Sequence, residues 1–235
     1  MTDKVRSRYV RELEELKNET LKMGFFAFEA LKGAVMAFLS YSTDEARKII
    51  EQDVVIDRWE MDIDRRALNL LALEQPVAKD LRLIVSCLRM NVDIERIGDQ
   101  AVNIAQRTIR LAKLPSICQP PQFESLYKVT ARMIEQALKA FADDDVNLAQ
   151  QVCGMDDEAD EANFAVMRDA LKYMIEHPSC AEQALQTIIV SRCLERSADI
   201  ATNIAESVVF IVEGKNVKHV FPDKEKEKTR KHWDI

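Results

Sequence analysis

Glycine and proline are scarce in this 235-residue chain, which has five glycines and six prolines. Both residues interrupt helices and make turns, so a chain with few of them has few places to turn. The segments between the prolines are long and rich in Leu, Ala, Glu and Arg, and 47% of all residues are hydrophobic. The composition therefore predicts long helices with sizeable buried cores.

The chain also lacks long hydrophobic runs, a net positive charge and cysteines spaced as a CxxC pair. No stretch approaches the roughly 18 consecutive apolar residues of a membrane span, and the charged segment from Asp3 to Glu19 has no signal-peptide core, so we expect a cytoplasmic protein without a transmembrane segment. A net charge of −7 argues against nucleic acid, which rewards clustered Lys and Arg. Five cysteines without a CxxC pair argue against a disulfide framework or a thiolate zinc site.

A polar motif occurs twice in the chain, one hundred residues apart. The segment Glu95 to Ala105 returns as Glu195 to Ala205, with Glu, Arg, Asp and Asn kept and most of the residues between them changed. Upstream, the two halves align at an offset of 103 residues. A repeated core would keep its apolar residues first, so this pattern indicates duplication of a polar site.

Helix-breaking residues place the motif on helices. They predict six helices, over residues 5–40, 43–73, 77–112, 121–142, 145–176 and 179–213. Ser42 can cap the second helix, and Pro76 and Pro178 break the chain between neighbouring helices. Three helices per half, joined by short turns, predict an all-α fold of two tandem antiparallel three-helix bundles. The expected domains are residues 1–115 and 116–214, followed by a polar tail at 215–235.

Acidic residues in each half lie at the same height on neighbouring helices. Around Pro76, Asp57 and Glu95 are each 19 residues from the turn, and Asp53 and Asp99 are each 23 residues from it. The second half repeats this arrangement around Pro178 with Asp156, Asp160, Glu195 and Asp199. Residues four apart share a helix face, so two helices in each half present four carboxylates to one another.

Four facing carboxylates repel one another, and something must offset that repulsion. Protonation or the neighbouring Arg96 and Arg196 could do so in part, and a hard cation would do so most completely. The oxygen ligands, with Asn103 and Asn203 as further donors, suit Mg²⁺, Mn²⁺, Ca²⁺ or iron better than copper. The alternative is a pair of solvated helix faces with salt bridges to the arginines.

These motifs, together with the hairpin sequence from Leu73 to Arg82, resemble the PhoU family of phosphate-regulon proteins over about residues 1–215. The resemblance implies a cytosolic, non-enzymatic negative regulator of phosphate uptake and phosphate-starvation signalling. Its implied partners are the ATPase of the phosphate ABC transporter and a membrane sensor histidine kinase. We also expect a homodimer.

The resemblance also implies metal sites, because some members carry iron clusters or other metals on these motifs. Iron is favoured, with Mn, Mg, Zn or Ca as alternatives. Carried over residue by residue, the expected ligands are Asp53, Asp57, Glu95, Asp99 and Asn103 in the first half, and Asp156, Asp160, Glu195, Asp199 and Asn203 in the second.

The two halves are not identical, and other functions compete with this one. Glu60 and Asp93 of the first half are replaced by Asn163 and Cys193 in the second, so we expect weaker metal binding there. A carboxylate-bridged di-iron enzyme would need Glu-x-x-His on two helices, and no histidine of this chain follows a Glu at that spacing. A helical scaffold without metal is the third hypothesis.

Overall fold

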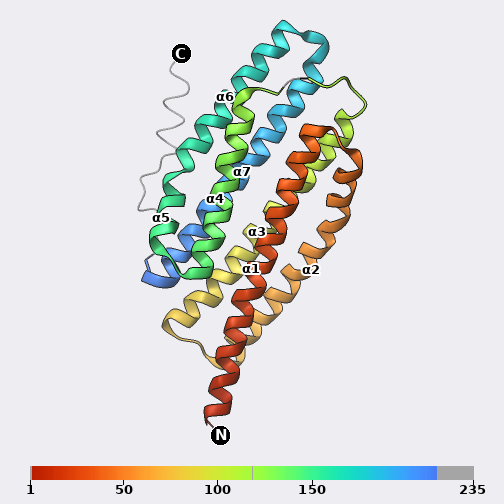
Figure 1. Ribbon diagram of the computed structural model, residues 1–235. Helices are drawn as coiled ribbons and strands as arrows, with labels where there is room; N and C mark the ends of the chain where they lie inside the picture. Colours follow the sequence, from red (N-terminus) through yellow and green to blue (C-terminus); the bar gives the residue numbers. More distant parts are fainter. Residues whose placement is uncertain (1, 118, 216–235) are drawn as a thin grey trace.

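The structure, a computed structural model, describes residues 2–117 and 119–215, with side chains from residue 7 onward. The described chain is helical and contains no strand (Figure 1). Its helices are α1 (Thr2–Ser40), α2 (Thr43–Glu74), α3 (Ala78–Leu111), α4 (Pro121–Asp143), α5 (Val146–Gly154), α6 (Asp156–Glu176), the 3₁₀ turn η1 (Pro178–Cys180) and α7 (Ala181–Glu213). The all-α prediction is confirmed. The predicted tail lies outside the described residues, apart from Lys215.

The expected fifth helix, over residues 145–176, was wrong as a single element. The structure divides it at Met155 into α5 and α6. Gly154 ends α5, and glycine is among the least favourable residues in a helix interior. The predicted start of this helix, at residue 145, agrees with the structure, in which α5 begins at Val146. The side chain of Asp145 caps the helix by accepting a hydrogen bond from Leu148 N at 3.0 Å.

Other helix ends follow the signals in the sequence. Ser42 caps α2 by accepting from Glu45 N at 3.5 Å, and Gly214 closes α7 with a φ of 72°. An L side chain rarely adopts that left-handed conformation, whereas glycine does so without steric cost.

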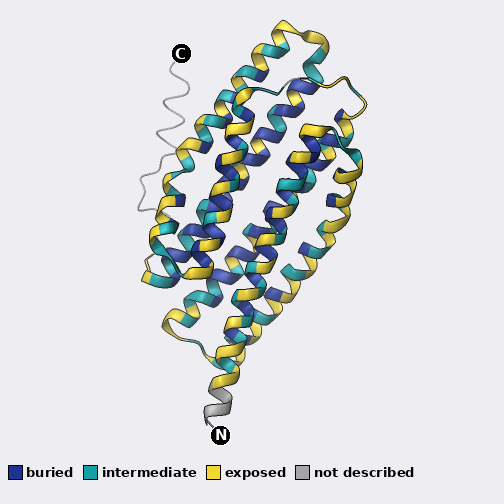
Figure 2. Cartoon of the chain, in the orientation of Figure 1, coloured by how far each residue is buried: buried dark blue, intermediate teal, exposed yellow. Residues whose placement is uncertain are grey.

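Two three-helix bundles lie side by side. Helices α1, α2 and α3 pack together, as do α4, α5–α6 and α7, and the contacts of α3 with α7 and of α1 with α4 join the bundles. Helices α2 and α6 lie at opposite edges of the assembly (Figure 1). Buried residues line the inward helix faces (Figure 2), and the rings of Phe38 and Phe123 meet between the bundles with centroids 5.6 Å apart.

Polar contacts also tie the two halves together. Asp144, at the left-handed end of α4, accepts hydrogen bonds from Lys17 Nζ and Lys79 Nζ, both at 2.7 Å. Arg82 on α3 donates from Nε to the backbone oxygen of Ile211 on α7 at 3.0 Å. Asp144 therefore ties the end of α4 to α1 and to the start of α3, and Arg82 ties α3 to the C-terminal end of α7.

Helix α1 is rich in apolar residues, although charged and polar residues interrupt them along the sequence. Residues Ser7–Ser40 contain an 18-residue window that is long and apolar enough to cross a membrane by length and composition, although 56% of that window is buried inside the protein. Its apolar side chains, such as Leu16, Met23 and Leu31, form part of the core. The helix therefore has the properties of a central core helix.

Candidate metal centres

The first acidic cluster lies between α2 and α3. Asp53 and Glu95 are half-buried, whereas Asp57 and Asp99 are exposed. Burial, followed by the negative charges of Asp99, Glu60, Asp57 and Asp53 in that order, raises the pKa of Glu95 to about 7. Burial also raises the pKa of Asp53, followed by the charges of Asp57 and Asp99. The structure thus brings together the four acids that the sequence placed at one height.

Glu60 is a fifth member of this cluster, which the ligand set expected from the sequence omitted. Burial raises its pKa, and the charges of Asp64, Asp57 and Asp99 add to the effect. It follows Asp57 by three residues on α2, and that spacing on one helix face was the signal that could have found it. Glu60 is thus the fifth carboxylate of the first cluster, and Asp64 adds a sixth negative charge beside Glu60.

The second acidic cluster lies between α6 and α7. Asp160, Glu195 and Asp199 each offer a carboxylate oxygen, and these oxygens lie within 4.8 Å of one another. In the described part of the chain, no other group of three acids, histidines or cysteines converges as closely. Asp156 is near enough for its charge to raise the pKa of Glu195. The second half thus also gathers its four expected acids.

Glu195 is the central carboxylate of the second cluster. Burial raises its pKa, and the neighbouring Arg192 opposes that shift through an ion pair of 3.0 Å with Oε1. The other oxygen, Oε2, is buried and has no hydrogen-bond partner among the described residues. A buried carboxylate oxygen without a donor costs free energy, and a cation held with Asp160 and Asp199 would satisfy it. The donor set therefore fits a hard metal ion.

The two clusters differ in how their charge is compensated. Arg192 and Arg196 lower the pKa of Glu195, whereas no arginine contributes to the raised pKa of Glu95. The residue that corresponds to Arg192 in the first half is Val92. Partial neutralisation lets three acids converge in the second half, and the first half keeps more uncompensated negative charge.

Asn103 and Asn203 extend each motif by one helical turn and are half-buried. The structure records no contact of either amide with the carboxylates in the described part of the chain. The backbone oxygen of Asn203 accepts from Ser207 Oγ at 2.9 Å, as in an ordinary helix. Both asparagines therefore lie on the helices that carry the acidic clusters, one turn beyond them. Their role as metal ligands stays a prediction.

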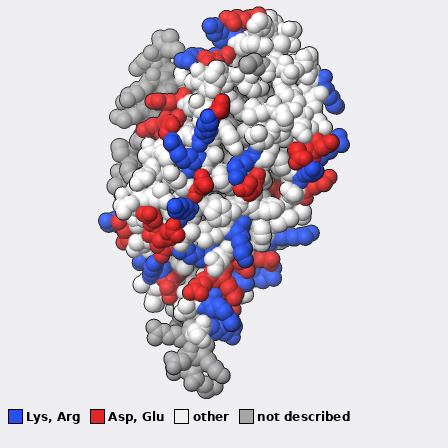
Figure 3. Space-filling model, in the orientation of Figure 1, with Lys and Arg blue, Asp and Glu red and all other residues white. Residues whose placement is uncertain are grey.

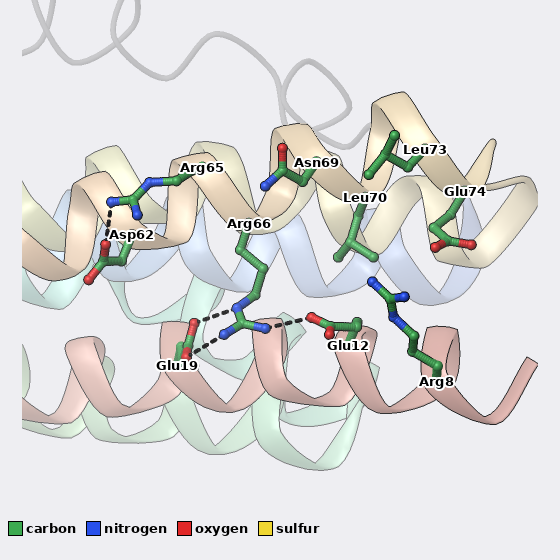
Figure 4. Close-up of a pocket in the computed structure, with 10 residues that line it drawn as sticks. All are labelled: Arg8, Glu12, Glu19, Asp62, Arg65, Arg66, Asn69, Leu70, Leu73 and Glu74. Atoms are coloured by element: carbon green, nitrogen blue, oxygen red, sulfur yellow. Dashed lines mark hydrogen bonds and ion pairs between the residues drawn. The ribbon is translucent and has the colours of Figure 1, made fainter. Parts of the chain in front are cut away.

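A separate polar groove of about 400 Å³ lies between α1 and α2. Arg66 on α2 occupies its centre and points toward α1, between Glu12 and Glu19 (Figure 4). It pairs with Glu12 at 2.7 Å and with Glu15 and Glu19 at 2.9 Å each. Sequence reasoning missed this cluster, although the three glutamates recur on one face of α1. Because the ion pairs occupy the guanidinium, we assign the groove a role in packing α1 on α2.

No single sign of charge dominates the face shown in Figure 3, where Lys and Arg side chains intermingle with Asp and Glu. This face therefore presents no basic patch for nucleic acid, in line with the net charge of −7.

Comparison with known proteins finds one protein family that matches this chain twice, once in each half. The family model described as PhoU domain matches residues 20–108 and 123–208, one copy in each bundle. The chain belongs to the PhoU family. Each copy of the PhoU domain contains one of the two acidic clusters. The two domain copies therefore coincide with the repeat seen in the sequence.

Individual PhoU relatives agree along nearly the whole chain. The phosphate-specific transport system accessory protein PhoU homolog of Pseudomonas aeruginosa is 33% identical over 223 residues, covering 94% of this chain and 91% of that protein. Homolog 1 of Thermotoga maritima is 34% identical over 216 residues, covering 89% and 91%.

Solved PhoU structures share the fold. The crystal structure of PhoU from P. aeruginosa superposes with a TM-score of 0.83 and 34% identity, covering 88% of this chain and 100% of that one. The phosphate transport system regulatory protein PhoU from Streptococcus pneumoniae gives 0.82 and 26% identity, covering 89% and 99%. The relatives are named as accessory or regulatory proteins, which agrees with the expectation that this PhoU-family chain is not an enzyme.

Proposed function

We propose that this chain is an accessory protein of a phosphate transport system that negatively regulates phosphate uptake and phosphate-starvation signalling from the cytoplasm. The observation that carries the proposal is similarity to proteins of that name over 94% of this chain and 91% of the relative. Similarity over both bundles supports a shared role for the whole molecule. No catalytic residue is needed for such a role, because a regulator acts through the surfaces that it presents.

We further propose that it works as an adaptor between the ATPase of the phosphate ABC transporter and a membrane sensor histidine kinase, and that it is a homodimer. The family resemblance supports this proposal. Large apolar side chains such as Met36, Val54 and Leu68 are about half exposed, and exposed apolar side chains at helix surfaces favour protein contacts over an isolated monomer.

The acidic clusters are proposed to bind metal, with iron favoured and Mn, Mg, Zn or Ca as alternatives. A bound cation would neutralise the carboxylates and link α2 to α3 and α6 to α7. In the first half Asp53, Asp57, Glu60, Glu95 and Asp99 are the candidate ligands; in the second they are Asp156, Asp160, Glu195 and Asp199. The convergence of three second-half carboxylates within 4.8 Å supports this proposal, as does the buried Glu195 Oε2.

The competing functions make different predictions about the same residues. A di-iron enzyme would need histidine ligands, and neither cluster contains one; the described His177 is exposed at the end of α6. His219 and His232 lie outside the described residues. A metal-free scaffold would keep the acids as solvated, salt-bridged faces.

Metal analysis separates these functions. We would purify the untagged protein without chelator and measure bound metal by mass spectrometry in the wild type and in Asp99→Asn plus Asp199→Asn. The expected result is a stoichiometric metal that the double variant lacks. A matched control is Asp62→Asn plus Asp169→Asn, which changes acids on α2 and α6 outside the two clusters. Absence of metal even after reconstitution with iron, manganese and magnesium would leave only the scaffold.

Regulation is tested separately in cells. Deletion of the gene should raise phosphate uptake and the expression of phosphate-starvation genes at high phosphate, and the wild-type gene should restore repression. Co-purification from membranes should recover the transporter ATPase and the kinase. If deletion leaves both uptake and gene expression unchanged, the regulatory proposal fails whatever the metal content.

A further inference from the structure

One face of α6 is exposed along the whole length of the helix. Steps of three and four residues place its members on one side: Asp157, Glu161, Phe164, Arg168, Leu171 and Ile175, all of them exposed. We refer to these six residues as the outer face of α6. The face is acidic at its N-terminal end and apolar at its C-terminal end, where Leu171 is 49% and Ile175 is 80% exposed.

Among the described residues, the packing of α6 leaves Leu171 and Ile175 exposed. Helix α6 packs against α4 and α7 with other residues, including Ala159, Val166 and Ala170, which are buried. The outer face instead borders a shallow groove of about 420 Å³, whose lining is mainly apolar and consists of Phe164, Met167, Leu171 and Ile175 with Arg168, Lys172 and Glu176. Contiguous exposed apolar side chains of this kind mark interaction surfaces.

The tail of this chain has the same order of properties. Residues 224–231 contain five basic and two acidic residues, and Trp233 and Ile235 follow them. We propose that residues 224–235 dock on the outer face of the same molecule's α6. The basic run lies beside Asp157 and Glu161, and Trp233 and Ile235 cover Leu171 and Ile175.

The tail is long enough to reach this face. Asp160 and Asp199 are level, because their oxygens lie within 4.8 Å. At about 1.5 Å per helical residue, Leu171 is some 16 Å above that level, and Gly214, at the end of the neighbouring antiparallel α7, is some 22 Å below it. The 19 residues from 215 to 233 span up to about 60 Å when extended, which exceeds the roughly 40 Å required.

The corresponding face of α2 does not match the tail. At the repeat offset of 103, Asp157 and Glu161 correspond to Val54 and Arg58, so the acidic end is missing there. Helix α2 packs on α1 and α3 and does not contact α7 in the described structure. Leu68 of α2, equivalent to Leu171 and 56% exposed, therefore provides a matched control.

Fluorescence of Trp233 tests the proposal in the full chain. The chain has two tryptophans, so Trp59→Phe leaves Trp233 as the only emitter. We expect blue-shifted emission that resists iodide quenching, independent of protein concentration. Leu171→Asp should shift the emission to that of solvent-exposed tryptophan and raise quenching several-fold, whereas Leu68→Asp should change neither. Solvent-like emission from Trp233 in the protein without a surface substitution would overturn the proposal. Protection of Trp233 from iodide that develops only as protein concentration rises would also overturn it, because that result indicates docking between copies.

Hydrogen exchange gives a second measurement that does not depend on Trp59→Phe folding correctly. In the otherwise unchanged full chain, Trp233→Ser should accelerate exchange within residues 164–175 and leave residues 61–72 of α2 unaffected. Equal exchange of residues 164–175 in both proteins would overturn the proposal.

Discussion

The side chain of Ile56 on α2 fills the space where Gly98 on α3 lacks a Cβ, beside the first acidic cluster. A Cβ added to Gly98 would lie 2.6 Å from Ile56 Cδ1 and 3.5 Å from Asp53 Oδ1. In the second repeat the corresponding residues are Ala159 and Ala198, which are both buried. The two repeats therefore fill the same helix crossing with one large and one small residue in the first half, and with two small ones in the second.

Gly98→Ala should destabilise the protein. Ile56 is 1% exposed, so its side chain cannot move away freely, and overpacking of this kind costs about 1–3 kcal/mol. The better helix propensity of alanine offsets up to about 1 kcal/mol. Urea unfolding measures the net loss. In an Ile56→Val background, which removes Cδ1, the same substitution should become neutral or stabilising. An equal loss in both backgrounds would contradict the contact as its cause.

Glu95→Gln should stabilise the metal-free protein at neutral pH. The pKa of Glu95 is raised to about 7 by burial and by the neighbouring acids, so the folded state binds a proton more tightly than the unfolded chain does. Stability therefore falls as pH rises from about 4.5 to 7. After allowance for solvent screening, the variant should gain on the order of 1 kcal/mol at pH 8 and little at pH 4.

Urea unfolding at several pH values with a chelator present checks this prediction. Glu51→Gln removes one negative charge from the exposed surface of α2 and serves as the control. A gain of the same size for Glu51→Gln would mean that net charge, not the cluster, sets the effect.

The two clusters should bind metal with different affinities. The first has five interacting acids without a compensating arginine, whereas Arg192 pairs with Glu195 in the second. Under limiting metal, Asp99→Asn should therefore reduce occupancy more than Asp199→Asn does. Binding at the first site should also release more protons, because Glu95 is partly protonated near pH 7. Titration calorimetry in buffers of different ionisation enthalpy measures that release; equal occupancy of both sites would refute the order.

Asp144→Asn should loosen the junction between the repeats. Burial alone would raise the pKa of Asp144, but hydrogen bonds from Lys17 and Lys79 outweigh it and hold the pKa below its usual range. The resulting stability is present above the unfolded pKa of about 4 and is lost as pH falls through the lower folded value. Asparagine tolerates the left-handed backbone at this position, so the variant tests the charge alone.

The expected loss is about 1 kcal/mol at pH 7 and close to zero at pH 2, measured by urea unfolding. Asp143→Asn, at the exposed neighbouring residue, should have no effect. A loss that persists at pH 2 would show that the carboxylate's charge is not what joins the halves.

The sequence by itself determined the helical repeat and the height of the acids. Scarce glycine and proline left long helices, and equal distances from Pro76 placed Asp57 and Glu95 level, because helix rise per residue is constant. Local signals failed at Met155, where one expected helix became two. Glu60 was counted among the acids of the first half but left out of its ligand set, although its three-residue spacing from Asp57 places both on one helix face.

Only the tertiary structure decided how far the acids of each cluster are buried and how closely they converge. The sequence already has Val92 at the position of Arg192, and Arg192 pairs with Glu195 within one helix. Helix packing, in contrast, is what brings Asp160, Glu195 and Asp199 within 4.8 Å of one another and buries Glu95 among acids from two helices. Likewise, no local pattern predicted that Asp144 would bind Lys17 and Lys79 from the other half. Burial and ion pairing depend on which residues the packing of helices brings together, and helix periodicity fixes the face of a side chain but not its neighbour.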